Sequence, residues 1–310
     1  MNNFMLFAIL NLIFVLLLSP LYISLIKKVK AIIQGRKGPG IFQTYRNLLK
    51  LLKKESVYSY NSSVIMRVAP FIDFTASVLL VFFIPLFYLP AGSTIFGNII
   101  LFLYTLMVAK FFIALSGLDA GSTFGGMGSS REMSISAIIE PTLIIIFTAL
   151  AISFNSINFF EIINGAISSQ NHIFLWLLFI PFILVFLTES ARVPIDNPET
   201  HLELTMIHEA MILEQSGKNL ALIELSSAIK QILFMGIIIN IFFPMGITTS
   251  LAASAIFLAI MAFIIKSAFF AVGIGVIESY VAKLRLFRLP NLFAISYFLS
   301  LTAILIEVLL

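Results

Sequence analysis

The segment Glu189-Ser-Ala-Arg-Val-Pro-Ile-Asp-Asn-Pro-Glu-Thr-His-Leu-Glu-Leu-Thr-Met-Ile-His-Glu-Ala-Met-Ile-Leu-Glu-Gln-Ser-Gly217 gathers the acidic charge of a very apolar chain. It holds six of the fifteen acidic residues and two of the three histidines. Long apolar segments flank it on both sides, which places these protonatable groups at a predicted membrane boundary. We expect residues 190–219 to form the loop around which the rest of the chain is organised.

The composition is that of a membrane protein. Of 310 residues, 60% are apolar and only 11% are charged, whereas an ordinary soluble protein would have a charged fraction near a quarter. Each span needs roughly 20 apolar residues, so the length allows about eight or nine spans and no sizeable soluble domain. We therefore predict an all-α integral membrane protein in which residues 1–310 form a single polytopic domain.

Apolar runs bounded by polar residues or by Gly and Pro predict eight transmembrane helices. Helices are favoured because unpaired backbone groups are too costly in lipid, and the runs lack the alternation of barrel strands. The first run has no basic segment before it and is too long for a signal peptide, so we expect it to be retained as a span. The predicted spans are residues 4–26, 71–89, 98–116, 134–154, 173–190, 220–243, 250–277 and 291–309.

The basic residues predict how these spans are oriented. Sixteen of the nineteen Lys and Arg residues lie in segments 27–70, 117–133, 191–219 and 279–290, and none lies in the segments that alternate with them. By the positive-inside rule, the charged loops are cytoplasmic and both termini lie on the outer side of the cell's inner (cytoplasmic) membrane. This topology also explains the net positive charge, so nucleic-acid binding is not expected.

The basic segment 27–70 contains an amphipathic stretch on the cytoplasmic side. Phe42, Tyr45, Leu48, Leu49 and Leu52 recur at helical spacing, and Arg46, Lys50, Lys53 and Lys54 take the other face. One interpretation is a helix that lies on the anionic leaflet of the lipid bilayer, and another is a docking surface for a soluble partner. Both can hold at once.

Residues 117–133 form a predicted loop that is rich in glycine. The loop lacks a Gly-Lys-Ser/Thr sequence and follows no strand, so a phosphate-binding loop is not indicated. We expect its glycines to allow close backbone approach to another subunit.

Several ionisable side chains fall in or beside the predicted spans. Each would cost a few kcal/mol if it faced lipid, so we expect most of them to face one another or a hydrated interior. They could be buried ion pairs that lock helices together, or a proton or ion path, and their spread over most of the spans favours the path. Glu224, Ser227 and Gln231 form a polar strip on one helix, beside Lys230. The group comprises Asp73, Lys110, Glu140, Glu189, Glu224, Lys230, Lys266, Glu278 and Glu307.

Metal binding in this chain is not favoured. His201 and His208 are seven residues apart, but the His-Glu-x-x-His spacing of a zinc site is absent, so an interfacial or proton-relaying histidine is the better interpretation. The chain has no cysteine, which removes iron–sulfur clusters and thiolate metal sites. Any such redox centre must belong to a partner, and no catalytic centre is expected here.

Eight ordered motifs resemble those of the membrane subunit of formate hydrogenlyase and other group 4 energy-converting [NiFe] hydrogenases, which is homologous to subunit 1 of respiratory complex I. The resemblance covers nearly the whole chain, and the Ser-Gly-Leu-Asp-Ala-Gly-Ser sequence fits the hydrogenase branch better than the quinone-reducing branch. The motifs are Arg36-Lys37-Gly38-Pro39-Gly40-Ile41-Phe42-Gln43, Ser116-Gly117-Leu118-Asp119-Ala120-Gly121-Ser122, Ser130-Arg131-Glu132, Glu140-Pro141, Pro194-Ile195-Asp196 with Glu199 and Glu203, Glu214-Gln215-Ser216-Gly217, Lys230-Gln231, and Glu278 with Ala282-Lys283-Leu284-Arg285.

The resemblance implies a non-catalytic anchor with eight spans that docks the cytoplasmic large and small hydrogenase subunits. Those partners would carry the iron–sulfur clusters and the Ni–Fe centre, and the acidic loop would begin a proton path towards antiporter-like membrane subunits. We expect Arg36, Lys37, Arg46, Arg131, Arg192 and Arg285 to contribute to docking. Together, the resemblance and the ionisable groups predict a coupling role for Asp73, Glu140, Glu189, Asp196, Glu199, Glu203, Glu209, Glu214, Glu224, Lys230, Lys266 and Glu278.

Two other functions remain as alternatives. The chain could be the quinone-binding subunit of a complex I-like dehydrogenase, for which a tunnel reaching the loops around Arg36 and Asp196 would be the sign. It could also be a stand-alone secondary transporter, but the internal repeat typical of such proteins is not evident.

Overall fold

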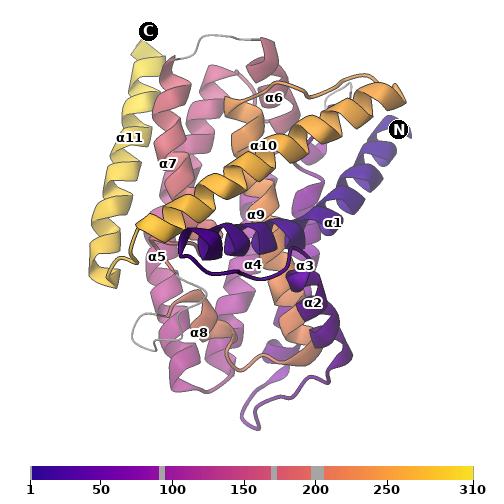
Figure 1. The fold of residues 1–310 in the computed structure, drawn as a ribbon. Helices are drawn as coiled ribbons and strands as arrows, with labels where there is room; N and C mark the ends of the chain where they lie inside the picture. The colour runs from indigo at the N-terminus through magenta and orange to yellow at the C-terminus, as the bar shows by residue number, and fades with distance from the viewer. Residues whose placement is uncertain (1, 91–94, 169–172, 197–205, 310) are drawn as a thin grey trace.

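The computed structural model describes residues 2–90, 95–168, 173–196 and 206–309, and these residues form a bundle of helices (Figure 1). The two described ends of the chain lie at the same end of the bundle, and α2 and α8 lie towards the other (Figure 1). The helices are α1 (Asn2–Ile33), α2 (Gln43–Lys53), α3 (Val64–Val81), α4 (Ile99–Asp119), α5 (Thr123–Ser153), α6 (Phe159–Ser168), α7 (Ile173–Glu189), α8 (His208–Ile212), α9 (Gly217–Phe242), α10 (Ala253–Tyr280) and α11 (Leu289–Leu309), with short 3₁₀ turns at Ile95–Gly97 and Leu286–Arg288.

The predicted all-helical membrane fold is confirmed. Among the described residues, seven helices are long and apolar enough to cross a membrane. They overlap seven of the eight predicted spans. The eighth is α7, a mostly apolar helix whose 17 residues lie at the lower limit of what crosses a bilayer. Helix α9 lies at the centre of the bundle, and α10 crosses it obliquely (Figure 1).

Loops that the positive-inside rule assigns to one side also meet in the structure. At one end, the backbone N–H of Leu284 donates to the carbonyl of Pro194, and the N–H of Val57 donates to the hydroxyl of Ser216. At the other end, the N–H of Leu89 donates to the carbonyl of Thr248. The charged and uncharged loops are therefore sorted to opposite ends of the bundle.

The predicted amphipathic helix is present as α2. The hydroxyl of Tyr45 donates to the carbonyl of Leu17 on α1, and partial burial raises the pKa of this phenol. Only Leu48 of the apolar face is buried, whereas Phe42 and Leu49 are about 60% exposed. The apolar face of α2 is thus mostly available to a leaflet or to a partner.

The third helix differs from its prediction. Residues 71–89 were expected to be one span, but α3 ends at Val81 and an apolar, non-helical stretch follows. Its carbonyls are satisfied by two buried amides: Asn11 donates to Val81 and Ile84, and Asn240 donates to Pro85 and Leu86, at 2.8–3.0 Å. Irregular backbone is tolerated at membrane depth when protein groups supply these bonds, so the two asparagines allow the helix to end early.

Two further segments predicted as loops are helical. Residues 159–168 form α6, which is too short to span a bilayer and packs its apolar face on α9. Residues 117–133 are divided between α4 and a much longer α5, which begins where the hydroxyl of Ser122 accepts a bond from the N–H of Gly125. The predicted Gly-rich loop is therefore only a short turn.

Two glycines of this segment allow close approach within the chain, and the predicted approach to another subunit stays a prediction. A Cβ on Gly125 would lie 2.3 Å from the carbonyl oxygen of Gly117, which lets α5 turn back tightly on α4. A Cβ on Gly128 would lie 2.8 Å from the Cβ of Ala210 and 2.9 Å from the carbonyl oxygen of Ile207. A small residue on α5 thus allows α8 and the adjoining residue Ile207 to pack closely against this helix.

We predict that Gly128→Ala loosens this contact. The new methyl group cannot fit without moving α8, and such overpacking costs about 1–3 kcal/mol. The amides of residues 208–212 should therefore exchange faster in hydrogen–deuterium exchange. Gly126→Ala is the matched control, because no atom lies within 4 Å of a Cβ at that position. Equal exchange in the two variants would contradict this account of how α8 is held.

Candidate functional site

We call residues 189–217 the acidic segment. Its described parts, residues 190–196 and 206–217, form hydrogen bonds with the helices beneath them. The amide of Gln215 donates to the hydroxyl of Ser116 at 2.7 Å and to the carbonyl of Met66 at 3.0 Å. Asp119 accepts from the N–H groups of Ser63 and Met66 at the start of α3. Two of the motifs that carried the resemblance, around Ser116 and Gln215, thus meet at one end of the bundle and fix α3, α4 and α9 to each other.

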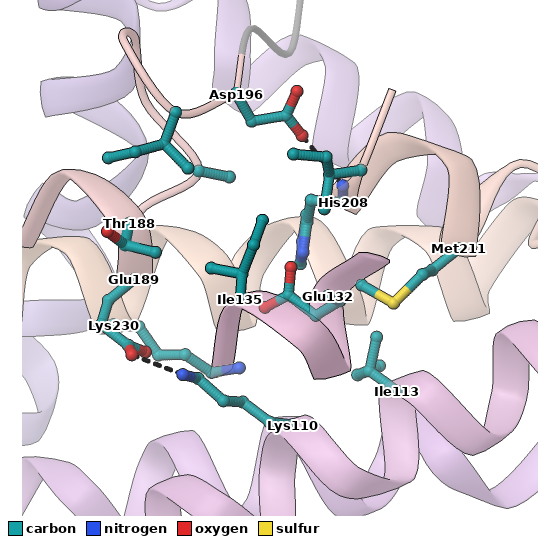
Figure 2. A pocket seen from close by; sticks show the side chains of 13 residues that line it. Lys110, Ile113, Glu132, Ile135, Thr188, Glu189, Asp196, His208, Met211 and Lys230 are labelled. Carbon is teal, nitrogen blue, oxygen red and sulfur yellow. Dashed lines mark hydrogen bonds and ion pairs between the residues drawn. The ribbon is translucent and has the colours of Figure 1, made fainter. Parts of the chain in front are cut away.

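A cavity of about 40 Å³ lies beneath this segment, between α4, α5, α7 and α9 (Figure 2). We call it the acidic cavity. On this measure one water needs about 10–15 Å³, so the cavity has room for about three. Its polar lining consists of Lys110, Glu132, Thr188, Glu189, Asp196, His208 and Lys230.

The charged groups of the acidic cavity come from different helices and face one another. The ammonium of Lys110 on α4 pairs with the carboxylate of Glu189 at the end of α7. The imidazole of His208 points towards the carboxylate of Glu132 on α5 (Figure 2). Lys110 also interacts electrostatically with Glu132 and Glu140. The cavity therefore holds groups of both signs within reach of each other.

Asp196 connects the acidic cavity to the loops at the end of the bundle. One of its oxygens accepts from the ammonium of Lys283 at 2.6 Å. The other accepts from the backbone N–H of His208 at 2.9 Å (Figure 2). The carboxylate is only 3% exposed. Because it holds α8 and the segment after α10 together, a change of charge on Asp196 would be felt by both.

A second connection leads from the cavity into the bundle. Lys230 lines the cavity from α9 and pairs with Asp73 of α3 at 2.5 Å. Asp73 is 1% exposed, so this ion pair is well shielded from the surroundings of the bundle. Ionisable groups are thus found from Asp196 of the acidic segment, through the acidic cavity, to the contact between α3 and α9.

Arg192 forms a separate cluster beside these groups. Its guanidinium donates to Glu278 of α10 at 3.3 Å and to the amide oxygen of Gln231 on α9 at 3.0 Å. Glu278 also pairs with Lys30 of α1 at 3.7 Å. The acidic segment is therefore tied to α1, α9 and α10 by buried charges.

A second cavity, of about 240 Å³, lies between α1, α2, α9 and the acidic segment. We call it the side cavity. Glu224, Ser227 and Gln231 line it together, as expected for the polar strip predicted on this helix. Glu209 lines it as well, and His208 and Ala191 lie between it and the acidic cavity because they line both.

Some predicted coupling residues lie outside these cavities. Glu199 and Glu203, together with His201, lie outside the described residues. Glu214 is exposed at the end of the segment. Among the described residues, Lys266 contacts none of those that line the acidic cavity. Its ammonium donates to the carbonyls of Phe243 and Met245, beyond the other end of α9.

The structure also adds residues that the sequence did not single out as site residues. Glu132 was assigned to a loop, but α5 begins at Thr123, so Glu132 shares this helix with Glu140. The N-cap at Ser122 was the available signal. Lys283 and Lys30 enter as partners of Asp196 and Glu278, and Lys110, already noted among the intramembrane groups, pairs with Glu189. This pairing between distant segments could not be read from one sequence.

The predicted docking residues divide into two groups. Arg36, Lys37, Arg46 and Arg285 are exposed. Arg192, in contrast, is 4% exposed in this chain and its guanidinium donates to Gln231 and Glu278. Arg131 is half-buried and donates to the carbonyl of Met206, which holds the acidic segment against α5.

The described residues contain no group of three or more His, Asp or Glu side chains that could hold a metal ion. The chemistry that the acidic cavity does offer is the holding and transfer of protons, since carboxylates, an imidazole and lysines face one small polar space.

Fold and site together define a multi-pass helical membrane protein with a buried set of ionisable groups. The family model described as NADH dehydrogenase matches residues 6–309, and the chain belongs to this family.

Known relatives are components of redox complexes. Hydrogenase-4 component C of Escherichia coli is 29% identical over 286 residues, which cover 90% of this chain and 88% of that protein. Formate hydrogenlyase subunit 4 of the same organism is 28% identical over 301 residues, covering 92% and 94%. The resemblance predicted from the motifs is confirmed.

A solved structure has the same fold. A chain of the membrane-bound sulfane sulfur reductase, an archaeal respiratory membrane complex, superposes with a TM-score of 0.83 at 17% identity, covering 98% of this chain and 99% of that one.

We predict that the Asp73–Lys230 pair can be replaced without loss of the fold. Asp73→Leu or Lys230→Met alone leaves an uncompensated buried charge and should destabilise the protein by about 3–5 kcal/mol. The double variant removes both charges and should recover most of this loss. The free energies of unfolding of the native chain, the two single variants and the double variant, measured in detergent, form the double-mutant cycle that tests this. Additive losses in the double variant would show that the two groups do not act as a pair.

Proposed function

We propose that this chain is the membrane anchor and coupling subunit of a hydrogenase-type, redox-driven ion pump. The observation that carries the proposal is that Asp196, bonded to Lys283, and Lys230, paired with Asp73, both line the acidic cavity together with Lys110, Glu132, Glu189 and His208. Its relatives are components of hydrogenase-4 and formate hydrogenlyase. The electron chemistry would take place in partner subunits that hold the iron–sulfur and Ni–Fe centres.

The geometry suggests how a signal would enter the membrane. Asp196 joins α8 to the segment after α10 and bonds to the backbone of His208, whose ring points at Glu132. A partner that moves the acidic segment would move His208 relative to Glu132. It would thereby change the proton affinity of groups that face the cavity, because each carboxylate there depends on nearby cations for its charge.

The exposed basic residues give a place for the soluble partner. Arg36, Lys37, Arg46 and Arg285 are all exposed, and α2 adds Lys50, Lys53 and Lys54. They lie at the end of the bundle to which the acidic segment is bonded. We infer that this end is cytoplasmic, in the inner membrane, and that antiporter-like subunits receive the ions within the bilayer.

One observation favours a second candidate, a quinone-binding subunit. Arg192 and Gln231 both line the side cavity, and each has a buried N–H group, Nε and Nε2, without a partner among the described residues. Such orphaned donors need an explanation, and a quinone carbonyl that reached them after a small side-chain movement would be one acceptor.

We expect the purified complex to contain no stoichiometric quinone, as in the hydrogenase-type proposal. Solvent extraction of the complex, followed by mass spectrometry, measures this. The comparison variant is Ser227→Phe, which places a ring in the side cavity. Quinone that is present in the native complex and lost in this variant would replace the first proposal with the second.

We predict that Glu132→Gln and Asp196→Asn separate redox turnover from ion transport. Each change keeps the size of the side chain and removes its ability to hold a proton or a charge, and loss of a proton-transferring group typically slows that step about 100-fold. The assembled complex in proteoliposomes should therefore turn over electrons while forming a much smaller ion gradient.

Glu55→Gln is the matched control, since Glu55 is an exposed acidic residue outside both cavities. If both Glu132→Gln and Asp196→Asn transport as many ions per electron as the native complex, the acidic cavity is not part of the ion path. Loss of assembly in Asp196→Asn alone would instead assign it a structural role.

A further inference from the structure

An apolar groove with a volume of about 530 Å³ opens between α7, α9 and α10, away from both cavities. Its walls include Phe179, Phe186, Phe243 and Phe269, and Lys266 is the one charged residue among those that line it. Phe269 and Ile265 at its rim are 81% and 69% exposed, so the groove lies at the outer surface of the bundle.

Lys266 gives the groove a polar end. Its ammonium donates to the carbonyl of Phe243 at 2.9 Å and to the carbonyl of Met245, both just beyond the end of α9. A lysine ammonium has three N–H donors, and the structure gives no partner for the third among the described residues. A lysine side chain near a helix end can extend its ammonium towards lipid headgroups, and Lys266 extends towards the end of α9.

The rest of the groove follows α10 away from this charge. From Lys266 to Ile277 the axis of α10 advances about 16 Å, and this helix runs obliquely across the bundle (Figure 1). Gly273 lies along this path, and no atom is found within 4 Å of the position that its Cβ would take. The groove thus combines an apolar slot along α10 with a cation at one end.

We propose that this groove binds an anionic phospholipid, with the phosphate at Lys266 and an acyl chain along α10 past Gly273. Charge complementarity argues for a lipid of this class. A purely apolar partner helix would leave the remaining donor of Lys266 without an acceptor, whereas a phosphate oxygen satisfies it. The site is independent of the coupling role, because none of its residues lines either cavity.

The test uses the purified full chain in detergent, with phosphatidylglycerol or phosphatidylcholine of equal chain length added. Native mass spectrometry measures retained lipid, and thermal unfolding measures stabilisation. The native chain should retain one phosphatidylglycerol in preference to phosphatidylcholine. Gly273→Leu should abolish retention of both lipids by filling the slot. Lys266→Met should keep the lipid but weaken the preference for phosphatidylglycerol about fivefold.

Matched controls are Gly126→Leu, another helical position with no atom within 4 Å of a Cβ, and Lys218→Met, an exposed lysine at the other end of α9. Both should retain lipid as the native chain does. Unchanged retention in Gly273→Leu, or equal retention of the two lipids by the native chain, would overturn the proposal.

A partner helix is the other possible occupant, and the absence of cysteine allows a direct check. Gly273→Cys would be the single cysteine of the chain. In the assembled complex, an apolar maleimide should reach it only after lipid is removed. Efficient cross-linking of this cysteine to a protein subunit would show that protein fills the groove and would overturn the proposal.

Discussion

The structure depends on the cost of placing charge in a medium of low dielectric constant. An isolated ion in hydrocarbon is expensive, so a buried charge persists only with a partner and with hydrogen bonds around it. Here each major pair joins helices that are distant in sequence: Asp73 of α3 to Lys230 of α9, and Lys110 of α4 to Glu189 of α7. Lipid gives little hydrophobic drive for helices to associate, so these pairs specify which helices meet.

The same constraint acts on the backbone. The stretch after α3 is not helical, and its carbonyls would be unsatisfied in lipid. Asn11 and Asn240, from α1 and α9, are fully buried and donate to three of them and to the carbonyl of Val81 at the end of α3. Polar residues inside this bundle therefore serve two purposes, satisfying irregular backbone at one level and neutralising charges at another.

The sequence predicted the parts of this molecule that follow from local physics. Long apolar runs identify spans because only helices satisfy their backbone within lipid, and the amphipathic pattern identified α2. Boundaries were harder to predict where distant residues decide them, as at Val81, which ends α3 with help from Asn11. Glu132 was missed because glycines suggested a loop, whereas Gly125 and Gly128 allow packing of an extended α5.

Pairing was beyond the reach of one sequence, and it changes how the ionisable groups are understood. Part of the predicted path is also a set of ion pairs that hold the helices together. These roles are compatible when the pairs border a small polar cavity, since a paired carboxylate can exchange its cation for a proton if a water or a second group replaces the contact. Glu189, Glu132 and Lys110 border such a space, whereas Glu278 is enclosed by Arg192 and Lys30 and lines neither cavity. The first set is therefore suited to change its protonation state, and the second to hold the acidic segment in place while it does.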